Sequence, residues 1–238
     1  MTLCRLRRGF TERTLAILFG CSESLVSRFL NTWINFMYLE FKPLEEYMFQ
    51  DRRSQKHGMP KRFKSFVGLR VIVDCAEIQV ETPSNFQQQG NTWSSYKHSN
   101  TVKYLIGINC HGAVIYVSEA FEGSMSDKEV FMRSTIYDML VPGDVVMADR
   151  GFDIAHELDL KKVQLVIPSY LRGRDYLSAE EEVWSKKIAR ARIFVENAIG
   201  RIKMWRVLNG TFPQSTLPLV SQMVFVCACL TNFRPTLI

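Results

Sequence analysis

The order of apolar runs from Leu69 onward limits the possible folds more than any other feature of the sequence. Five runs rich in β-branched residues are typical of buried strands: LRVIVDC (69–75), TVKYLIGIN (101–109), GAVIYVSE (112–119), DVVMADRGF (144–152) and VQLVIP (163–168). Helical patterns cover residues 127–140, 154–162 and 178–205. Three antiparallel strands that lead into parallel crossovers predict an α/β fold, with one mixed sheet flanked by helices.

The first 50 residues have the pattern of two capped helices joined by a short glycine turn. Thr11 is placed to cap a helix that ends at Gly20, and Ser22 can cap the next helix, over residues 23–41. Apolar residues recur at helical spacing in this second helix, at Leu25, Val26, Phe29, Leu30 and Trp33. The layout predicts a small all-α helix-turn-helix region. Its second helix would present to a DNA groove the side chains of Ser24, Ser27, Arg28 and Asn31. A plain helical hairpin is the alternative.

Charge is distributed unevenly along the 238 residues. Lys and Arg outnumber Asp and Glu by 13 to 6 in residues 1–73 and by 8 to 1 in residues 186–238, whereas acids lead by 17 to 9 in between. Two basic flanks around an acidic middle predict that the terminal regions of the chain bind a polyanion and that the carboxylates of the middle region serve a separate, central site. Random segregation of charge on solvated faces is the alternative.

Three regions follow from these patterns. Residues 1–50 form the helix-turn-helix region, residues 51–68 a basic linker and residues 69–238 the sheet-forming domain. In the linker, Lys61 and Arg62 are expected to contact phosphates without reading sequence. A solvated joint without DNA contact is the alternative reading of the linker.

Two aspartates lie in or just beyond apolar strands. Asp74 lies in the interior or near the end of the first strand, and Asp149 at the C-terminal tip of the fourth, where open α/β sheets bind ligands. If these strands are neighbours, the two carboxylates converge. Aspartate is depleted in strands and almost never fully buried unless it is paired, so the two predict a bound cation.

Glu196 is the lone acid of the basic segment RARIFVENAIGRIKMW (190–205). At about 100° per residue it borders an apolar arc, so it can face the sheet edge while the helix stays packed. We interpret it as a third metal ligand, with Arg192 and Lys203 holding DNA backbone beside the site rather than neutralising it. The alternative is an ion pair with Arg192, four residues earlier, which can also coexist with the metal role when no metal is bound.

Three carboxylates suit a hard divalent cation such as Mg²⁺ (or Mn²⁺), which prefers oxygen ligands. Two such ions, about 4 Å apart, can clamp the attacking and leaving oxygens of an in-line phosphoryl transfer. We therefore expect two ions at Asp74, Asp149 and Glu196.

Five motifs in order, VIVDCAEI, SSYKHSNTVKYLIGI, GSMSDKE, VVMADRGF and ARIFVENAIGRIK, resemble the DDE-superfamily transposases of the Harbinger (PIF-like) type. The stretch LRRGFTERTLAILFGCSESLVSRFLNTWINF is similar to the helix-turn-helix that precedes the nuclease in such proteins. The resemblance covers nearly the whole chain. It implies an RNase H-like fold whose catalytic triad falls on Asp74, Asp149 and Glu196.

Further polar residues are expected to support this site or to contact DNA. Glu77 is expected on the face of its strand opposite Asp74, and Asp127 is expected to cap the following helix or orient the site. Neither is expected to be a principal metal ligand. Lys97, in a polar loop, and Arg172 and Arg174, in the loop SYLRGR, are candidate DNA contacts.

We therefore expect a metal-dependent DNA endonuclease and transposase that cuts and joins transposon DNA by two-metal in-line phosphoryl transfer. Its partners would be double-stranded DNA, as transposon ends and target, and an accessory DNA-binding protein, with the chain acting as a homodimer or larger assembly in the nucleus. The alternative is a domesticated, catalytically silent DNA-binding regulatory protein. A ribonuclease is less favoured because the front end resembles a reader of duplex DNA.

Cysteine and hydropathy patterns indicate a soluble, intracellular protein without a membrane partner. The six cysteines include no CxxC pair and are expected to be reduced, buried thiols. The apolar stretch 217–230 is too short to span a bilayer and predicts a buried helix.

Overall fold

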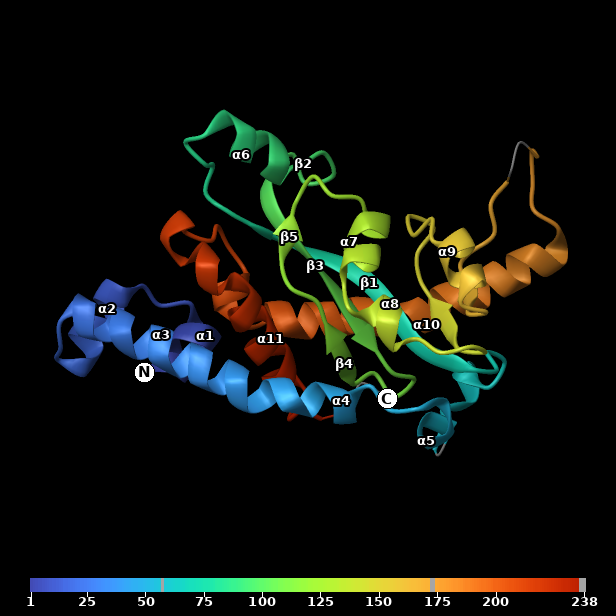
Figure 1. Cartoon of the computed structure of the whole chain (residues 1–238), viewed down its shortest axis with the longest axis horizontal. Coiled ribbons are helices and arrows are strands. Elements are labelled where there is room, and N and C mark those ends of the chain that lie inside the picture. Colours follow the sequence, from blue (N-terminus) through green and yellow to red (C-terminus); the bar gives the residue numbers. More distant parts are fainter. Residues whose placement is uncertain (57, 172–173, 236–238) are drawn as a thin grey trace.

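Within residues 1–56, 58–171 and 174–235, which the computed structural model describes, seven strands form one mixed sheet (Figure 1). Its path is β2-β3-β1-β6-β7, and β4 and β5 also pair with β3. The strands are β1 (Leu69–Gln79), β2 (Trp93–Ser94), β3 (Ser99–Ile108), β4 (Val114–Val117), β5 (Phe121–Glu122), β6 (Val145–Met147) and β7 (Gln164–Val166).

Strand direction confirms the predicted mixed sheet. Strand β3 is antiparallel to both β1 and β4, whereas β6 is parallel to β1 and β7 is parallel to β6. Three antiparallel strands thus lead into parallel crossovers. The short strands β2 and β5 extend the edge beside β3 and were not anticipated from the sequence.

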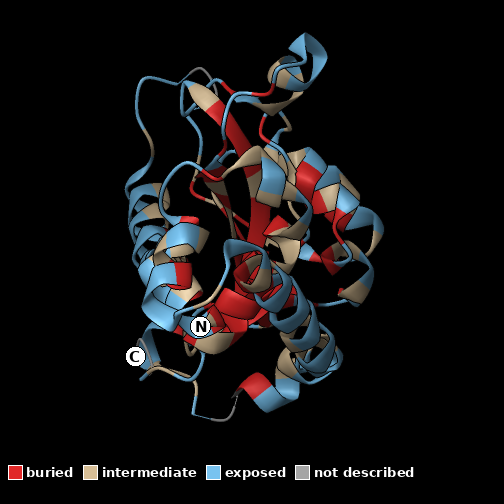
Figure 2. Cartoon of the chain, turned by 90° about the vertical axis from the view of Figure 1, so that its left-hand side faces the viewer, coloured by how far each residue is buried: buried red, intermediate tan, exposed pale blue. Residues whose placement is uncertain are grey.

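Strand β1 is the central strand of the sheet, and its side chains are buried on both faces. Ile72 and Ala76 join one hydrophobic core, and Val71 and Val73 join the other. This explains the continuous apolar run, since a strand covered on both faces shows no polar alternation. Figure 2 shows the buried strands running between layers of mostly exposed helices.

Different helices cover the two faces of the sheet. Long α10 and apolar α11 line one core together with the N-terminal helices, and α7, α8 and α9 line the other. The helices are α1 (Thr2–Arg8), α2 (Glu12–Phe19), α3 (Glu23–Phe41), α4 (Glu45–Met48), α5 (Arg52–Lys56), α6 (Phe86–Thr92), α7 (Asp127–Arg133), α8 (Ile136–Met139), α9 (Ala155–Leu160), α10 (Ala179–Lys203) and α11 (Val220–Thr231). The helix expected over 127–140 is split, because Ser134 ends α7 with extended backbone.

The N-terminal helices begin and end where their caps predict. Thr11 and Ser22 accept the backbone N–H groups of Thr14 and Leu25, and Gly20 closes α2 in the left-handed conformation. The expected apolar face of α3 is wrong in part, however. Val26 is buried, as expected, but Phe29 and Trp33 are exposed, because α3 packs through a narrower stripe.

The segment 51–68 contains more structure than a linker requires. It forms α5 and a short 3-10 helix, Lys61–Phe63, and the rings of Phe63 and Phe66 are buried in the core that α10 lines. The same core contains Leu30 and Ile34 of α3. The helical region and the sheet therefore share one hydrophobic core.

Apolar residues near the C-terminus form a core helix, as predicted. The expectation that this stretch is too short to span a bilayer was wrong by length and composition alone, because residues Gln214–Thr231 are long and apolar enough to cross a membrane. Half of this window is buried in the fold. Helix α11 packs against α3 and β4. The six cysteines are free, but Cys4 is exposed and Cys21 and Cys75 are only partly buried, so burial of every thiol was a wrong expectation.

Candidate active site

Asp74 and Asp149 are brought together by the parallel pairing of β1 with β6. In this register Ile72 pairs with Met147, and each aspartate lies two residues further along its own strand direction. Residues two apart on a strand point to the same face, so the register places both carboxylates at one level of the sheet. This confirms that the two strands are neighbours.

Glu196 reaches the same site from α10. Val195, Ala198 and Ile202, at nearby positions of the helix, are buried, whereas the Glu196 side chain is 55% exposed. The expected border position of Glu196 is thus confirmed. The helix is anchored at its start by Ser178, whose hydroxyl accepts the Glu181 N–H while the Glu181 carboxylate accepts the Ser178 N–H.

Arg192 lies among the three carboxylates: the ion contact with Glu196 that the spacing allows is present, and contacts with Asp74 and Asp149, which were not expected, accompany it. Its Nη1 donates a hydrogen bond to Oδ1 of Asp149 at 3.0 Å, and its Nη2 lies 3.9 Å from Oδ2 of Asp74 and 3.7 Å from Oε1 of Glu196. The spacing of four residues from Glu196 was visible in the sequence, but the contacts with Asp74 and Asp149 depend on how α10 crosses the sheet.

The environment of Asp74 differs from that of the other two acids. Its Oδ1 accepts the backbone N–H of Cys75 at 2.9 Å, and its side chain is 21% exposed, against 49% for Asp149. Burial raises the pKa of Asp74 to about 6, and the Arg192 charge partly offsets this effect. Burial also holds the pKa of the Cys75 thiol well above its usual range, which disfavours the thiolate.

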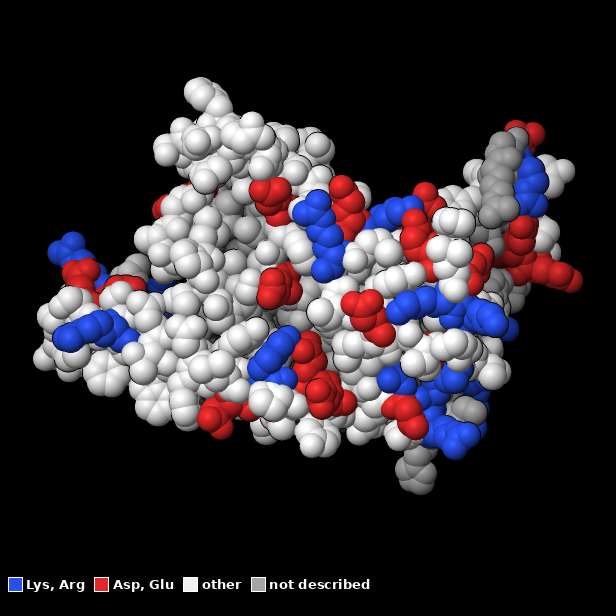
Figure 3. Space-filling model, viewed as in Figure 1, with Lys and Arg blue, Asp and Glu red and all other residues white. Residues whose placement is uncertain are grey.

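Asp74, Asp149 and Glu196 line a cleft with a volume of about 550 Å³. Its remaining wall comes from five elements or loops and includes Glu77, Tyr96, Lys97, Lys103, Asp127, Arg192, Ile199 and Lys203. Figure 3 shows the surface hollowed between the lobe of α6 and β2 and the lobe of α9, with acidic and basic side chains close together there.

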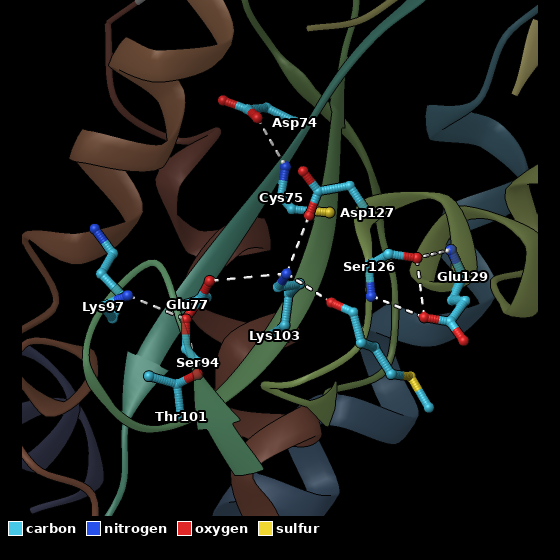
Figure 4. A network of polar contacts seen from close by, with 11 residues as sticks. Asp74, Cys75, Glu77, Ser94, Lys97, Thr101, Lys103, Ser126, Asp127 and Glu129 are labelled. Carbon is cyan, nitrogen blue, oxygen red and sulfur yellow. Dashed lines mark hydrogen bonds and ion pairs between the residues drawn. The ribbon is translucent and has the colours of Figure 1, made fainter. Parts of the chain in front are cut away.

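A second polar cluster lies on the opposite face of β1 from Asp74 (Figure 4). Lys103 of β3 pairs in register with Glu77, and its Nζ lies 3.8 Å from Oε1 of Glu77 and 3.1 Å from Oδ1 of Asp127. The same Nζ donates to the Met125 carbonyl at 2.7 Å. Glu77 therefore points away from Asp74, as expected, while still lining the cleft.

Two details of this cluster differ from the expectation. Ser126, not Asp127, caps α7, through a reciprocal pair of hydrogen bonds with Glu129. Lys103 was not anticipated as a site residue. A lysine inside an otherwise apolar strand was the available signal, but its pairing with Glu77 depends on the β1–β3 register.

The candidate DNA contacts fall into four groups. On α3, Ser24, Arg28 and Asn31 are exposed and Ser27 is half-buried; on the 3-10 helix, Lys61 and Arg62 are exposed. Lys97 and Lys203 line the cleft, and burial, with the Lys97 charge second, lowers the pKa of Lys203. Arg174 pairs with Glu181 at 2.7 Å, and Arg172 lies outside the described residues.

Two family models match this chain. Residues 73–232 match the DDE superfamily endonuclease, and residues 1–43 match the helix-turn-helix of DDE superfamily endonuclease. The chain belongs to the DDE superfamily endonucleases. Both matches imply DNA binding and support nuclease activity of the transposase type. Comparison with curated proteins and with solved structures finds no match.

The donor set fits the divalent metal ions that endonucleases of this superfamily use. Asp74, Asp149 and Glu196 offer carboxylate oxygens, which hard cations prefer, and the guanidinium of Arg192 shows that the site accepts positive charge. Among the described residues, no three His, Cys, Asp or Glu side chains lie close enough together to hold one ion in this arrangement.

Proposed function

We propose that this chain is a metal-dependent DNA endonuclease and transposase of the Harbinger (PIF-like) type, which cuts and joins transposon DNA. The observation that carries the proposal is the meeting of Asp74, Asp149 and Glu196 around one guanidinium, at the cleft of a chain from the DDE superfamily. The proposed nuclear location and the homodimer or larger assembly follow from the same resemblance.

In the proposed reaction, a water or a 3′-hydroxyl attacks a phosphodiester phosphorus and the bond to the leaving oxygen breaks in line. Asp74, Asp149 and Glu196 would hold Mg²⁺ or Mn²⁺, expected as two ions, which would supply positive charge to stabilise the attacking and leaving oxygens. Lys97 and Lys203 would bind the phosphates that enter the cleft, since both line it and carry positive charge. The Cys75 N–H orients the Asp74 carboxylate.

The helix-turn-helix would supply binding to double-stranded DNA, as transposon ends or target. Ser24, Arg28 and Asn31 lie exposed on α3 and can reach base edges or phosphates. Lys61 and Arg62 lie on the segment that connects α3 to β1 and would add phosphate contacts. An accessory DNA-binding protein is part of the proposal only through the resemblance.

Nicking of supercoiled plasmid in Mg²⁺ or Mn²⁺ tests the proposal. We expect Asp149→Asn and Glu196→Gln each to lower the nicking rate by about 100-fold or more, because each removes a ligand charge. Glu182→Gln is the matched control, since Glu182 lies on the same helix and, within the described part of the chain, its side chain pairs only with exposed Lys186.

Three results would count against the triad, the specificity of the assay or the nuclease assignment, in that order. Nicking that survives in both triad variants would reject the triad. Nicking that is lost in Glu182→Gln would show that the assay responds to damage of α10. Tight DNA binding by the wild type without nicking would favour the alternative, a catalytically silent DNA-binding protein.

A further inference from the structure

Arg192 lies among three carboxylates, but few of its donors have hydrogen-bond partners. A guanidinium can donate five hydrogen bonds. Across the described residues, that of Arg192 donates one, to Asp149, and its buried Nε has no partner. The distances from Nη2 to Asp74 and Glu196, 3.9 and 3.7 Å, are ion contacts beyond hydrogen-bond range.

Lys103 provides the comparison within the same cleft. Both side chains are nearly buried, at 12% and 11% exposure, and both lie between carboxylates from different elements. Lys103, however, also donates to the Met125 carbonyl at 2.7 Å and to Asp127 at 3.1 Å. Lys103 is therefore held in place by directed hydrogen bonds, whereas Arg192 is held mainly by charge.

The position of Arg192 sets it in competition with a divalent ion. The three carboxylates that surround it are the ones proposed to hold metal, and a cation bound by all three would repel the guanidinium at these distances. A long arginine side chain can leave by rotation about its own bonds, without movement of the α10 backbone.

We propose that Arg192 is an exchangeable counter-ion: it neutralises the triad when no divalent ion is bound, and the ion displaces it from the carboxylates. The displaced guanidinium then faces the cleft, where a DNA phosphate replaces the carboxylates as its partner. Metal binding and DNA binding are thereby linked through one side chain. This inference rests on the proposed function, because it takes Asp74, Asp149 and Glu196 as the metal ligands.

Mn²⁺ affinity of the full chain without DNA, measured by calorimetry, tests the exchange. Competition lowers the apparent affinity for the ion, so Arg192→Gln is expected to bind Mn²⁺ about tenfold more tightly than the wild type. Arg192→Lys keeps a cation and is expected to stay close to the wild type. The matched control is Arg190→Gln, on the same helix but exposed, with unchanged affinity.

Thermal unfolding gives a second readout. In EDTA, Arg192→Gln is expected to melt below the wild type, because the triad carboxylates then repel one another. With saturating Mn²⁺ the difference is expected to shrink or reverse. A purely structural arginine would lower the melting temperature equally in both conditions and leave Mn²⁺ affinity unchanged, and that result overturns the inference.

Glu196→Gln separates failure of the inference from failure of the proposed function. If the wild type binds Mn²⁺ and Glu196→Gln binds it more weakly, the triad holds the ion; equal or weaker binding by Arg192→Gln then rejects only the exchange. If Glu196→Gln binds as tightly as the wild type, or the wild type does not bind Mn²⁺, the metal site itself is rejected, and the exchange with it. Should Arg192→Gln fail to fold, Mn²⁺ binding by Arg192→Lys at ten times the wild-type affinity would overturn the inference.

Discussion

At the scale of single residues, the two cations of the cleft divide two tasks. Lys103 joins β1, β3 and the start of α7 by binding Glu77, Asp127 and a backbone carbonyl. Arg192 contacts three acids and forms one hydrogen bond. The first arrangement stabilises the fold, because removing one member leaves buried charge unpaired. The second balances the charge of three acids with a single directed hydrogen bond, to Asp149.

Replacement of Lys103 by methionine is expected to lower the free energy of unfolding by about 3–5 kcal/mol, because Glu77 then keeps a nearly buried charge beside Asp127 without a cation. Urea unfolding measures this. The control Lys186→Met breaks an exposed pair and is expected to cost about 0.3–0.5 kcal/mol. Adding Glu77→Gln to Lys103→Met should restore part of the loss. Equal costs for the two lysine variants would contradict this assignment.

Single residues also show why the site could be predicted only in part. Asp74, Asp149 and Glu196 were identifiable because an acid in an apolar strand, or alone in a basic helix, needs an explanation. Arg192 and Lys103 acquire their roles from register and helix crossing, which join residues far apart in the chain. Sequence spacing shows neighbours along one element, and these contacts are between elements.

At the scale of secondary-structure elements, α10 contributes Glu196 and Arg192 to the site, and charged hydrogen bonds to Glu181 hold its N-terminus in place. The Glu181 carboxylate accepts the Ser178 N–H at 2.8 Å and an Arg174 N–H at 2.7 Å. These hydrogen bonds, led by that of Arg174, lower the pKa of Glu181 from 4.5 to about 2. Three acids in the first turn also suit the positive end of the helix.

The lowered pKa of Glu181 predicts a pH-dependent contribution to stability. The unfolded chain binds a proton at this carboxyl more readily, so the stabilisation is complete above about pH 4.5 and is lost as pH falls towards about pH 2. Relative to Glu181→Gln, the wild type should be more stable at about pH 6 and lose more than half of this advantage by about pH 3. Urea unfolding at both pH values measures the difference.

A control for this pH effect is the neighbouring cap. Ser178→Ala removes a hydroxyl that does not ionise in this range and is expected to cost about 1 kcal/mol at either pH. A difference between the wild type and Glu181→Gln that stays constant from about pH 6 to about pH 3 would show that the charge of Glu181 does not stabilise the helix.

Most of the larger elements could be predicted because their signals are local. The caps at Thr11, Ser22 and Ser178 and the apolar run of β1 each lie within a few residues of the element they define. The two-residue strands β2 and β5 have no such signal, because they form only where β3 offers backbone partners. The exposed Phe29 shows the same limit, since helical periodicity does not say how wide the packed stripe is.

At the scale of the whole molecule, the regions proposed to bind DNA and to cut it are joined by packing rather than by a loose connection. Figure 1 shows α1–α3 lying at one end of the molecule and running along the side of the sheet towards α4 and α5. Helix α3 packs on α11, which in turn packs on α10, the helix that carries Glu196. DNA held by α3 would therefore have a fixed position relative to the cleft.

This shared packing predicts that the chain unfolds as one unit. Ile34 is fully buried in the core that also contains residues of α10 and β1. Ile34→Ala is expected to lower the free energy of unfolding by about 2–5 kcal/mol. Tryptophan fluorescence from single-tryptophan variants, keeping either Trp33 on α3 or Trp184 on α10, should report the same urea midpoint and the same shift.

The control Ile17→Ala, at a 76% exposed position of α2, should change stability by about 0.5 kcal/mol or less. A shift confined to Trp33 would mean that residues 1–50 unfold independently, and DNA bound by α3 could then change its position relative to the triad; a common shift supports a rigid coupling between recognition and cleavage.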